Sequence, residues 1–203
     1  MNLSSLILLF LTVAVCGMIA LNSSVFASYD LGQPSSVKIE IEAISGGDRY
    51  NDTTRFQDNV LVLRHAGGKS LPFDSTAVQI IGTGNSYKGI PGSGGELLFG
   101  DLVINYEHLT TDLKNQQFEK NNRETLKDGF WSSGEIIILT GNDSKNSSST
   151  SVFVSANGDA GTSNNYGFSS QTNAEITVYQ KISATHKRLL FKKEISVSKN
   201  RSA

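Results

Sequence analysis

Three histidines are the side chains best suited to acid–base or metal chemistry in this chain, and their spacing argues against both roles. His65, His108 and His186 are the only histidines. No two of them lie three or four residues apart, so a helix cannot present a pair of them to one metal ion. His65 ends an apolar run, His108 follows an acidic residue, and His186 adjoins a Lys-Arg pair. We therefore expect each to be an ordinary surface or strand-end residue.

Hydroxyl, carboxylate and glycine patterns do not supply a catalytic site either. The sequence has no G-x-S-x-G motif to expose a serine nucleophile. The glycine-rich stretch 92–95 lacks the spacing of a phosphate-binding loop. Glu40 and Glu42 alternate along a predicted strand and fall on its solvated face, and "NDSKNSSS" (142–149) lacks the ligand order of a calcium loop. We predict no enzymatic activity, no cofactor, no metal site and no small-molecule substrate.

Charge and cysteine content exclude further classes of protein. The formal net charge is −1, from 18 basic and 19 acidic residues, so no strong field attracts nucleic acid or anionic lipid. The basic stretch "KRLLFKK" (187–193) suits an edge strand that carries protective lysines. Cys16 is the only cysteine and cannot form an intramolecular disulfide. We expect no nucleic-acid partner.

Glycan acceptor motifs are the one chemical signal that points to a location. The sequence N-x-S/T occurs at Asn2, Asn22, Asn51, Asn142, Asn146 and Asn200. Asn51, Asn142 and Asn146 fall in predicted loops, where an extracytoplasmic protein would carry its N-glycans. We take these three as candidate glycosylation sites.

Residues 1–29 differ sharply from the rest of the chain, because they contain no charged side chain. The apolar run from Leu3 to Leu21, about 19 residues, is just long enough to cross a bilayer as a helix. It lacks the polar stripe of a water-exposed helix. The segment therefore sits in lipid, packs among copies of itself, or is removed after Ala27 as an export signal. We favour a retained helix over a cleaved signal.

The remaining chain reads as short strands separated by turns. In "VKIEIEAI" (37–44) apolar and charged residues alternate, as expected for a strand with one dry face. "NVLVLRH" (59–65), "TAVQIIG" (76–82), "EIIILT" (135–140) and "VFVSA" (152–156) predict further strands, and residues 174–197 predict a closing hairpin. Residues 82–95 read as a glycine-rich linker. The polar stretch 105–128 predicts a short surface helix or a mobile excursion.

The pattern favours a mainly β protein with a single N-terminal helix. We divide the chain into a hydrophobic helix (1–29), a hinge (30–36) and one head domain (37–198). The head has about seven to nine strands with regular turn signals, which is typical of an antiparallel, Ig-like β-sandwich.

Several motifs resemble those of archaeal type IV pilins and their archaellin-like relatives. "VLVLRHAGGKSLPFDSTAVQI" is similar to that family's strand, H-x-GG-x-x-L turn and return strand, with His65, Gly67, Gly68 and Leu71 in the motif positions. "FWSSGEIIIL" resembles its aromatic-x-x-G-(D/E) turn, at Trp131, Gly134 and Glu135. The closing hairpin and the N-terminal helix also match. Together these segments cover about half of the chain.

The resemblance implies a structural subunit of a surface filament, with the helix in the filament core and the β head outside. Its partners would be copies of itself, and a membrane contacted through residues 3–21 before assembly. Ala14 and Gly17, with Ala20 beyond them, offer small side chains for close helix contact. The residues expected to contact membrane or neighbouring helices are Leu6, Ile7, Leu8, Phe10, Leu11, Val13, Ala14, Gly17, Ile19 and Ala20.

A second interpretation stays open from the sequence. In it, the chain is a membrane-anchored or secreted extracellular β-sandwich protein that acts alone as an adhesin or envelope component. Both interpretations place the head at the cell surface.

Overall fold

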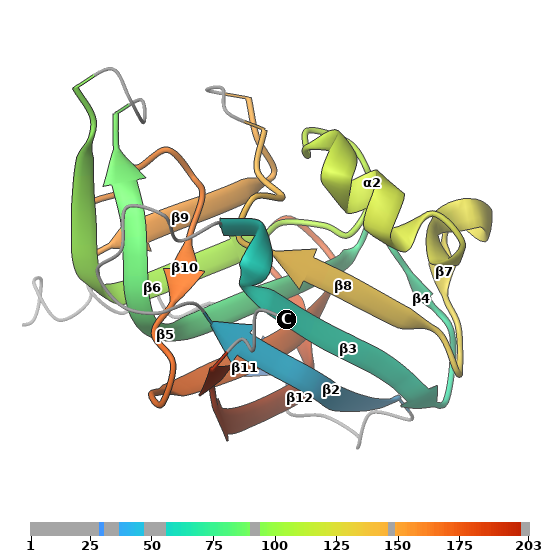
Figure 1. Cartoon of the computed structure of the whole chain (residues 1–203). Coiled ribbons are helices and arrows are strands. Elements are labelled where there is room, and N and C mark those ends of the chain that lie inside the picture. Colours follow the sequence, from blue (N-terminus) through green and yellow to red (C-terminus); the bar gives the residue numbers. More distant parts are fainter. Residues whose placement is uncertain (1–28, 31–36, 47–55, 90–93, 146–148, 200–203) are drawn as a thin grey trace, which may run out of the picture.

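The computed structural model describes residues 29–30, 37–46, 56–89, 94–145 and 149–199 (Figure 1). Within these ranges the protein is mainly β, as predicted. The expected N-terminal helix and hinge lie outside the described residues, except for Tyr29 and Asp30, which form a short strand. None of the helices in the described ranges has both the length and the apolar content that a membrane span requires.

The strands of the described part of the chain form two main sheets and one short strand pair. The larger sheet has the strand order β1 (Tyr29–Asp30), β12 (Lys187–Ser196), β11 (Asn173–Lys181), β5 (Thr76–Lys88), β6 (Glu96–Tyr106) and β9 (Val152–Ala156), and β10 (Gly167–Phe168) also pairs with β5. The smaller sheet has the order β13 (Ser198–Lys199), β2 (Lys38–Gly46), β3 (Val60–Gly67) and β8 (Ile136–Thr140). The short pair is β4 (Leu71–Pro72) and β7 (Phe130–Trp131).

Most of these pairings are antiparallel, but two very short ones are not. β1 runs parallel to β12, and β13 runs parallel to β2. The helical elements of the described chain are also short: η1 (Phe56–Asp58), α2 (Gln116–Asn122) and η2 (Thr125–Asp128). The predicted surface helix in the polar stretch 105–128 is thus present as α2.

The two sheets share one hydrophobic core. Leu61 and Leu63 of β3 belong to the same buried cluster as Ile80 of β5 and Val178 of β11. Figure 1 shows β2, β3 and β8 as one layer in front of β11 and β12. Burial of apolar side chains from both layers is the main force that holds the sheets together.

The alternating pattern of β2 predicted its two faces, but a bulge changes which residue reaches the core. Ile39 is buried, while Glu40 and Glu42 face solvent. The register shifts between Ile41 and Ala43, so one extra residue is inserted opposite β3. Because a bulge reverses the alternation beyond it, Ile44 is buried and Ala43 is exposed.

The glycine-rich linker predicted from residue 82 is wrong for its first seven residues. β5 continues to Lys88 and pairs with β6 from Val78 opposite Tyr106 to Lys88 opposite Glu96. The glycines here permit a close approach of two backbones. A Cβ atom added at Gly84 would lie 1.8 Å from the carbonyl oxygen of Gly167 in β10.

Candidate functional site

The structure places the three histidines in three separate parts of the fold. His65 lies inside β3 and is fully buried, so its assignment as an ordinary surface or strand-end residue is wrong. Its Nε2 lies 2.9 Å from the carbonyl oxygen of Lys69. His108 follows β6, and its Nδ1 lies 2.9 Å from the Thr110 hydroxyl. His186 closes the β11–β12 hairpin, where its carbonyl oxygen accepts from the Ile182 amide at 2.9 Å.

The two motifs that carry the family resemblance come together in one corner of the fold, which we call the Trp131 corner. Leu71 of β4 pairs with Trp131 of β7, although 60 residues separate them in the sequence. The rings of His65 and Trp131 meet edge to face, with centroids 5.8 Å apart. The Gly134 amide donates to the His65 carbonyl at 2.7 Å, and the His65 amide donates to the Glu135 carbonyl at 2.9 Å.

Local geometry explains why the second motif has a glycine followed by an acid. Gly134 has φ of +94°, which side-chain-bearing residues rarely adopt. The Glu135 carboxylate accepts from the Ser132 amide at 2.6 Å and closes the turn. The Trp131 indole donates to the Glu135 carbonyl at 3.1 Å. Trp131, Gly134 and Glu135 therefore each have a structural task in this turn, and the Trp131 indole is buried.

A second cluster is a buried polar group that joins β6, β8 and the loop before β10. The Asp143 carboxylate accepts from the Thr140 amide at 2.7 Å and from the Tyr106 hydroxyl at 3.0 Å. The Tyr166 hydroxyl lies 2.7 Å from that of Tyr106, within hydrogen-bond distance. Burial and the Asp143 charge raise the pKa values of both tyrosines well above 10. Asp143, Tyr106 and Tyr166 have almost no exposed surface, so we interpret the cluster as structural.

Lys114 is a nearly buried cation beside this cluster. Its Nζ donates to the Thr110 carbonyl and to the Ser151 hydroxyl, both at 2.9 Å. The same atom lies 5.1 Å from the centroid of the Phe118 ring, within cation–π range. Burial lowers the pKa of Lys114 to about 7 and raises the pKa of Asp143 to about 6.

These two pKa values predict that the combined contribution of Asp143 and Lys114 to stability is lowest near neutral pH. The folded-state pKa of Asp143 lies above its usual 3.8, so its contribution to stability is lost as the pH rises through about 6. The folded-state pKa of Lys114 lies below its usual 10.5, so its contribution is lost as the pH falls through about 7. Both contributions are therefore weakest between about pH 6 and pH 7.

Asp143→Asn should remove the acid side of this minimum. The amide keeps the size of the side chain and can still accept from the Thr140 amide. We expect the free energy of unfolding of the variant, relative to wild type, to rise by up to about 3 kcal/mol between pH 4 and pH 8. Urea unfolding at one-unit pH steps measures this difference. Asp101→Asn, at an exposed position of β6, is the matched control. A pH profile for Asp143→Asn that runs parallel to that of wild type would contradict the prediction.

The polar insertion between β6 and β7 covers the edge of the smaller sheet. β8 is the last strand of that sheet, so one side of its backbone has no strand partner in the described chain. The Asn122 side chain of α2 takes a strand's place: its Nδ2 donates to the Ile138 carbonyl at 2.9 Å, and its Oδ1 accepts from the Ile138 amide at 2.7 Å. The Thr125 hydroxyl donates to the Ile136 carbonyl at 2.9 Å. Covering the edge prevents uncontrolled pairing with other chains.

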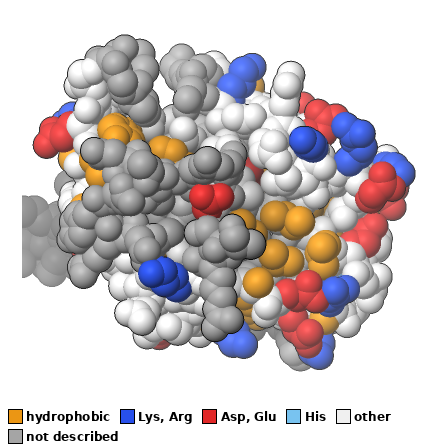
Figure 2. Space-filling model, viewed as in Figure 1, with side chains coloured by type: hydrophobic (Ala, Val, Ile, Leu, Met, Phe, Trp, Pro, Cys, Tyr) orange, Lys and Arg blue, Asp and Glu red, His pale blue; other side chains and the backbone are white. Residues whose placement is uncertain are grey.

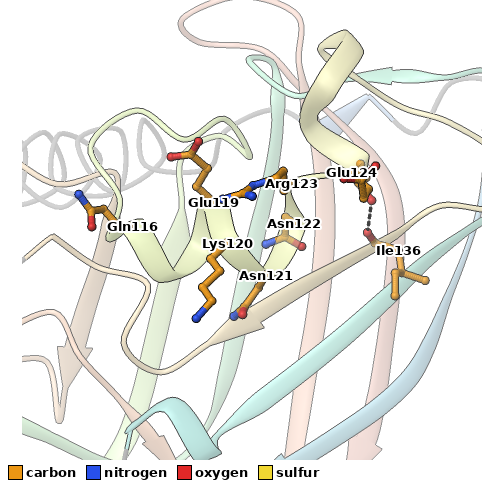
Figure 3. Close-up of a pocket in the computed structure, with 9 residues that line it drawn as sticks. Gln116, Glu119, Lys120, Asn121, Asn122, Arg123, Glu124 and Ile136 are labelled. Atoms are coloured by element: carbon orange, nitrogen blue, oxygen red, sulfur yellow. Dashed lines mark hydrogen bonds between the residues drawn. The ribbon is translucent and has the colours of Figure 1, made fainter.

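A groove of about 640 Å³ runs along this covering segment, but its lining offers little chemistry (Figure 3). The lining residues are Gln116, Glu119, Lys120, Asn121, Asn122, Arg123, Glu124, Thr125 and Ile136. They include no histidine, cysteine or serine. The Thr125 hydroxyl already donates its hydrogen bond to the Ile136 carbonyl of β8. Across the described ranges, no three His, Cys, Asp or Glu side chains are grouped as metal ligands.

Most of the site residues predicted from the sequence lie outside the residues that the structure describes. The expected helix-packing residues between Leu6 and Ala20, and the acceptors Asn51 and Asn146, lie outside the described residues. Asn142 is described and is partly exposed in the turn after β8, where its Oδ1 lies 2.8 Å from the Thr140 hydroxyl. Ser144 of the same acceptor motif is buried, so a glycan would have to be attached before the turn folds.

Sequence reasoning missed the Asp143–Tyr106–Tyr166 cluster and the part played by Asn122. The only signal in the sequence was an isolated acid after the apolar run of β8. No family model, curated protein or solved structure matches the chain.

Proposed function

We propose that the protein is a structural subunit of an archaeal type IV pilus-like surface filament, with an Ig-like β-sandwich head. The observation that carries this proposal is the Trp131 corner. Two motifs recognised separately for their resemblance to pilins pack against each other through His65 and Trp131. They belong to a mainly β head that follows an uncharged apolar segment.

The apolar segment has a physical role at both stages of such an assembly. A helix satisfies its backbone hydrogen bonds internally, so residues 3–21 can wait in the membrane before assembly. In the filament the same side chains, from Leu6 to Ala20, pack against helices of other subunits. The apolar surface then meets water at neither stage.

The head carries an apolar patch that neighbouring heads would cover in a filament. Val60 and Val62 of β3 and Ile136 and Ile138 of β8 are partly exposed on the outer face of the smaller sheet. Figure 2 shows hydrophobic side chains gathered on the face that carries these strands, with charged side chains beside them. Patches of this kind commonly mark protein contacts. Since α2 covers the edge of β8, contact through this face is favoured over strand pairing at that edge.

The proposal predicts that helix packing, and not only membrane insertion, depends on Gly17. Gly17→Leu keeps the segment apolar but removes its close-contact face, so surface filaments should fall by about tenfold or more. Val15→Leu enlarges the opposite face and serves as the matched control. Electron microscopy of cells and mass spectrometry of sheared filaments give the counts. Equal filament numbers in the two variants would contradict the proposed packing.

The alternative function is an anchored or secreted β protein that acts alone as an adhesin or envelope component. A hollow on the larger sheet, described below, is the observation that favours it. N-terminal sequencing of the native protein separates the two functions. A mature chain that begins between Leu3 and Leu6 agrees with a filament subunit, whereas one that begins at Ser28 agrees with an exported single-domain protein.

A further inference from the structure

The outer face of the larger sheet contains a hollow that Ala77 helps to line. It has a volume of about 360 Å³ and is lined by Ala77, Val78, Gln79, Asn105, Tyr106, Glu107, Phe153, Tyr179, Lys181 and Lys187. Strand register explains its shape. Ala77 of β5 lies opposite the bulky Tyr179 of β11. The short alanine side chain therefore leaves a depression beside the large tyrosine side chain.

Hydrogen bonds fix the orientation of the two side-chain amides in the hollow, those of Gln79 and Asn105. Gln79 lies opposite Asn105 of β6, which lies opposite Phe153 of β9. The Tyr179 hydroxyl donates to Gln79 Oε1 at 3.1 Å, and Gln79 Nε2 donates to Asn105 Oδ1 at 2.9 Å. This chain of bonds sets the direction of both amides and turns Asn105 Nδ2 into a donor for a ligand.

The charges around the hollow favour an anion. Lys181 and Lys187 lie opposite each other in the β11–β12 hairpin and both line the hollow, against the single carboxylate of Glu107. Lys187 Nζ is 5.7 Å from the centroid of the Tyr179 ring, and this cation–π contact holds the ammonium group over the ring. This local excess of positive charge occurs in a chain whose formal net charge is −1.

An apolar surface completes the hollow. Phe153 is 42% exposed at the end of the Gln79–Asn105 row, on the outer face of β9. An exposed ring beside a row of amides matches a ligand with one apolar face and several hydroxyl groups. A short acidic peptide would also use the lysines, but it presents fewer hydroxyl groups to this amide row than a sugar ring does.

We propose that the hollow binds an acidic saccharide through a uronic acid unit. The sugar carboxylate lies between Lys181 and Lys187, its hydroxyls bond to Asn105, Gln79 and Glu107, and its apolar face packs on Phe153. The volume lies at the lower end of the range for small-ligand sites, which suits one or two sugar rings. This inference does not rest on the proposed filament, because it concerns the head alone.

Saturation-transfer difference NMR on the full chain, with sodium glucuronate as the probe, tests the inference. Glucose tests the ring without the carboxylate, and acetate tests the carboxylate without the ring. We expect transfer to glucuronate, with binding about tenfold or more weaker for glucose and for acetate. Equal binding of glucose would overturn carboxylate recognition, and equal binding of acetate would overturn saccharide recognition.

Two pairs of variants show whether binding occurs in this hollow. Ala77→Leu fills it and should weaken glucuronate binding by about tenfold or more. Ile81→Leu, on the same face of β5 but outside the lining, should leave binding unchanged. Lys187→Gln should weaken binding similarly, whereas Lys193→Gln on β12 should not. Thermal unfolding confirms that each variant is folded, and undiminished binding by folded Ala77→Leu would overturn the proposal.

Discussion

Replacement of Trp131 by alanine is expected to lower the free energy of unfolding by about 3–5 kcal/mol. The indole is fully buried and is among the largest buried side chains of the described core. Its removal leaves a cavity between β7 and β3, and His65 loses its edge-to-face partner. Urea unfolding followed by circular dichroism measures the change.

Trp131→Phe separates the packing contribution from that of the hydrogen bond. The smaller ring keeps most of the contacts but cannot donate to the Glu135 carbonyl. That carbonyl still accepts from the His65 amide at 2.9 Å, so it is not left without a donor. We expect Trp131→Phe to lower the free energy of unfolding by about 1–2 kcal/mol.

The alanine variant gives the contradicting outcome. If Trp131→Ala lowers the free energy of unfolding by less than about 1 kcal/mol, the Trp131 corner is not part of the cooperative core.

Gly84→Ala is the second change with a large expected effect, because two backbones meet at this glycine. An added Cβ atom would lie 1.8 Å from the Gly167 carbonyl oxygen and 2.9 Å from Leu102 Cδ1. β10 would have to move away from β5 and take Tyr166 and Phe168 out of the core. We expect a loss of about 3 kcal/mol or more, with faster proteolysis of the segment around β10.

Gly82→Ala, two residues earlier in β5, is the matched control. Its added Cβ atom would meet the Ala174 Cβ at 3.4 Å, an ordinary contact distance. Neither glycine has positive φ, so the two variants differ mainly in steric space. We expect the Gly82 variant to unfold within about 1 kcal/mol of wild type. Equal stability of the two variants would contradict the close approach of β10.

The filament proposal and the saccharide proposal can fail independently. The first depends on Gly17 and the apolar segment, whereas the second depends on Ala77 and Lys187 in the head. A chain that forms filaments without binding glucuronate is a structural subunit alone. A chain that binds glucuronate without forming filaments is a binding module, in agreement with the alternative function.

Local sequence patterns were sufficient to predict most of the strands. The alternation in β2 and the apolar runs of β3 and β8 follow from the two faces of a half-buried sheet. These features could be predicted from short stretches of sequence, because the alternation of apolar and polar side chains along a strand involves only neighbouring residues. The basic stretch of β12 was predicted as an edge strand, but β1 pairs with it at Lys187 and Arg188, so β12 is not the last strand of the larger sheet.

Strand β10 and the end of β5 were not predictable in this way. β10 is only two residues long, Gly167 and Phe168, and the end of β5 is rich in glycine and polar residues, which locally favour turns. They become strands because the backbone of Gly167 fits against Gly84, a contact across 83 positions. The same reason applies to Asn122, whose amide replaces a strand at the edge of β8, since nothing near it in the sequence indicates that partner.

Residue types and their order were enough to show that this protein is mainly β, that its charge is nearly balanced, and that its first 29 residues are uncharged and mostly apolar. These properties depend on residue type and short-range order alone. The folded chain was needed to show that His65 is buried against Trp131, that Asp143 lies beside two tyrosines, and that Ala77 lines a hollow together with two lysines. Each of these depends on strand register, which brings distant residues to within a few ångströms of each other.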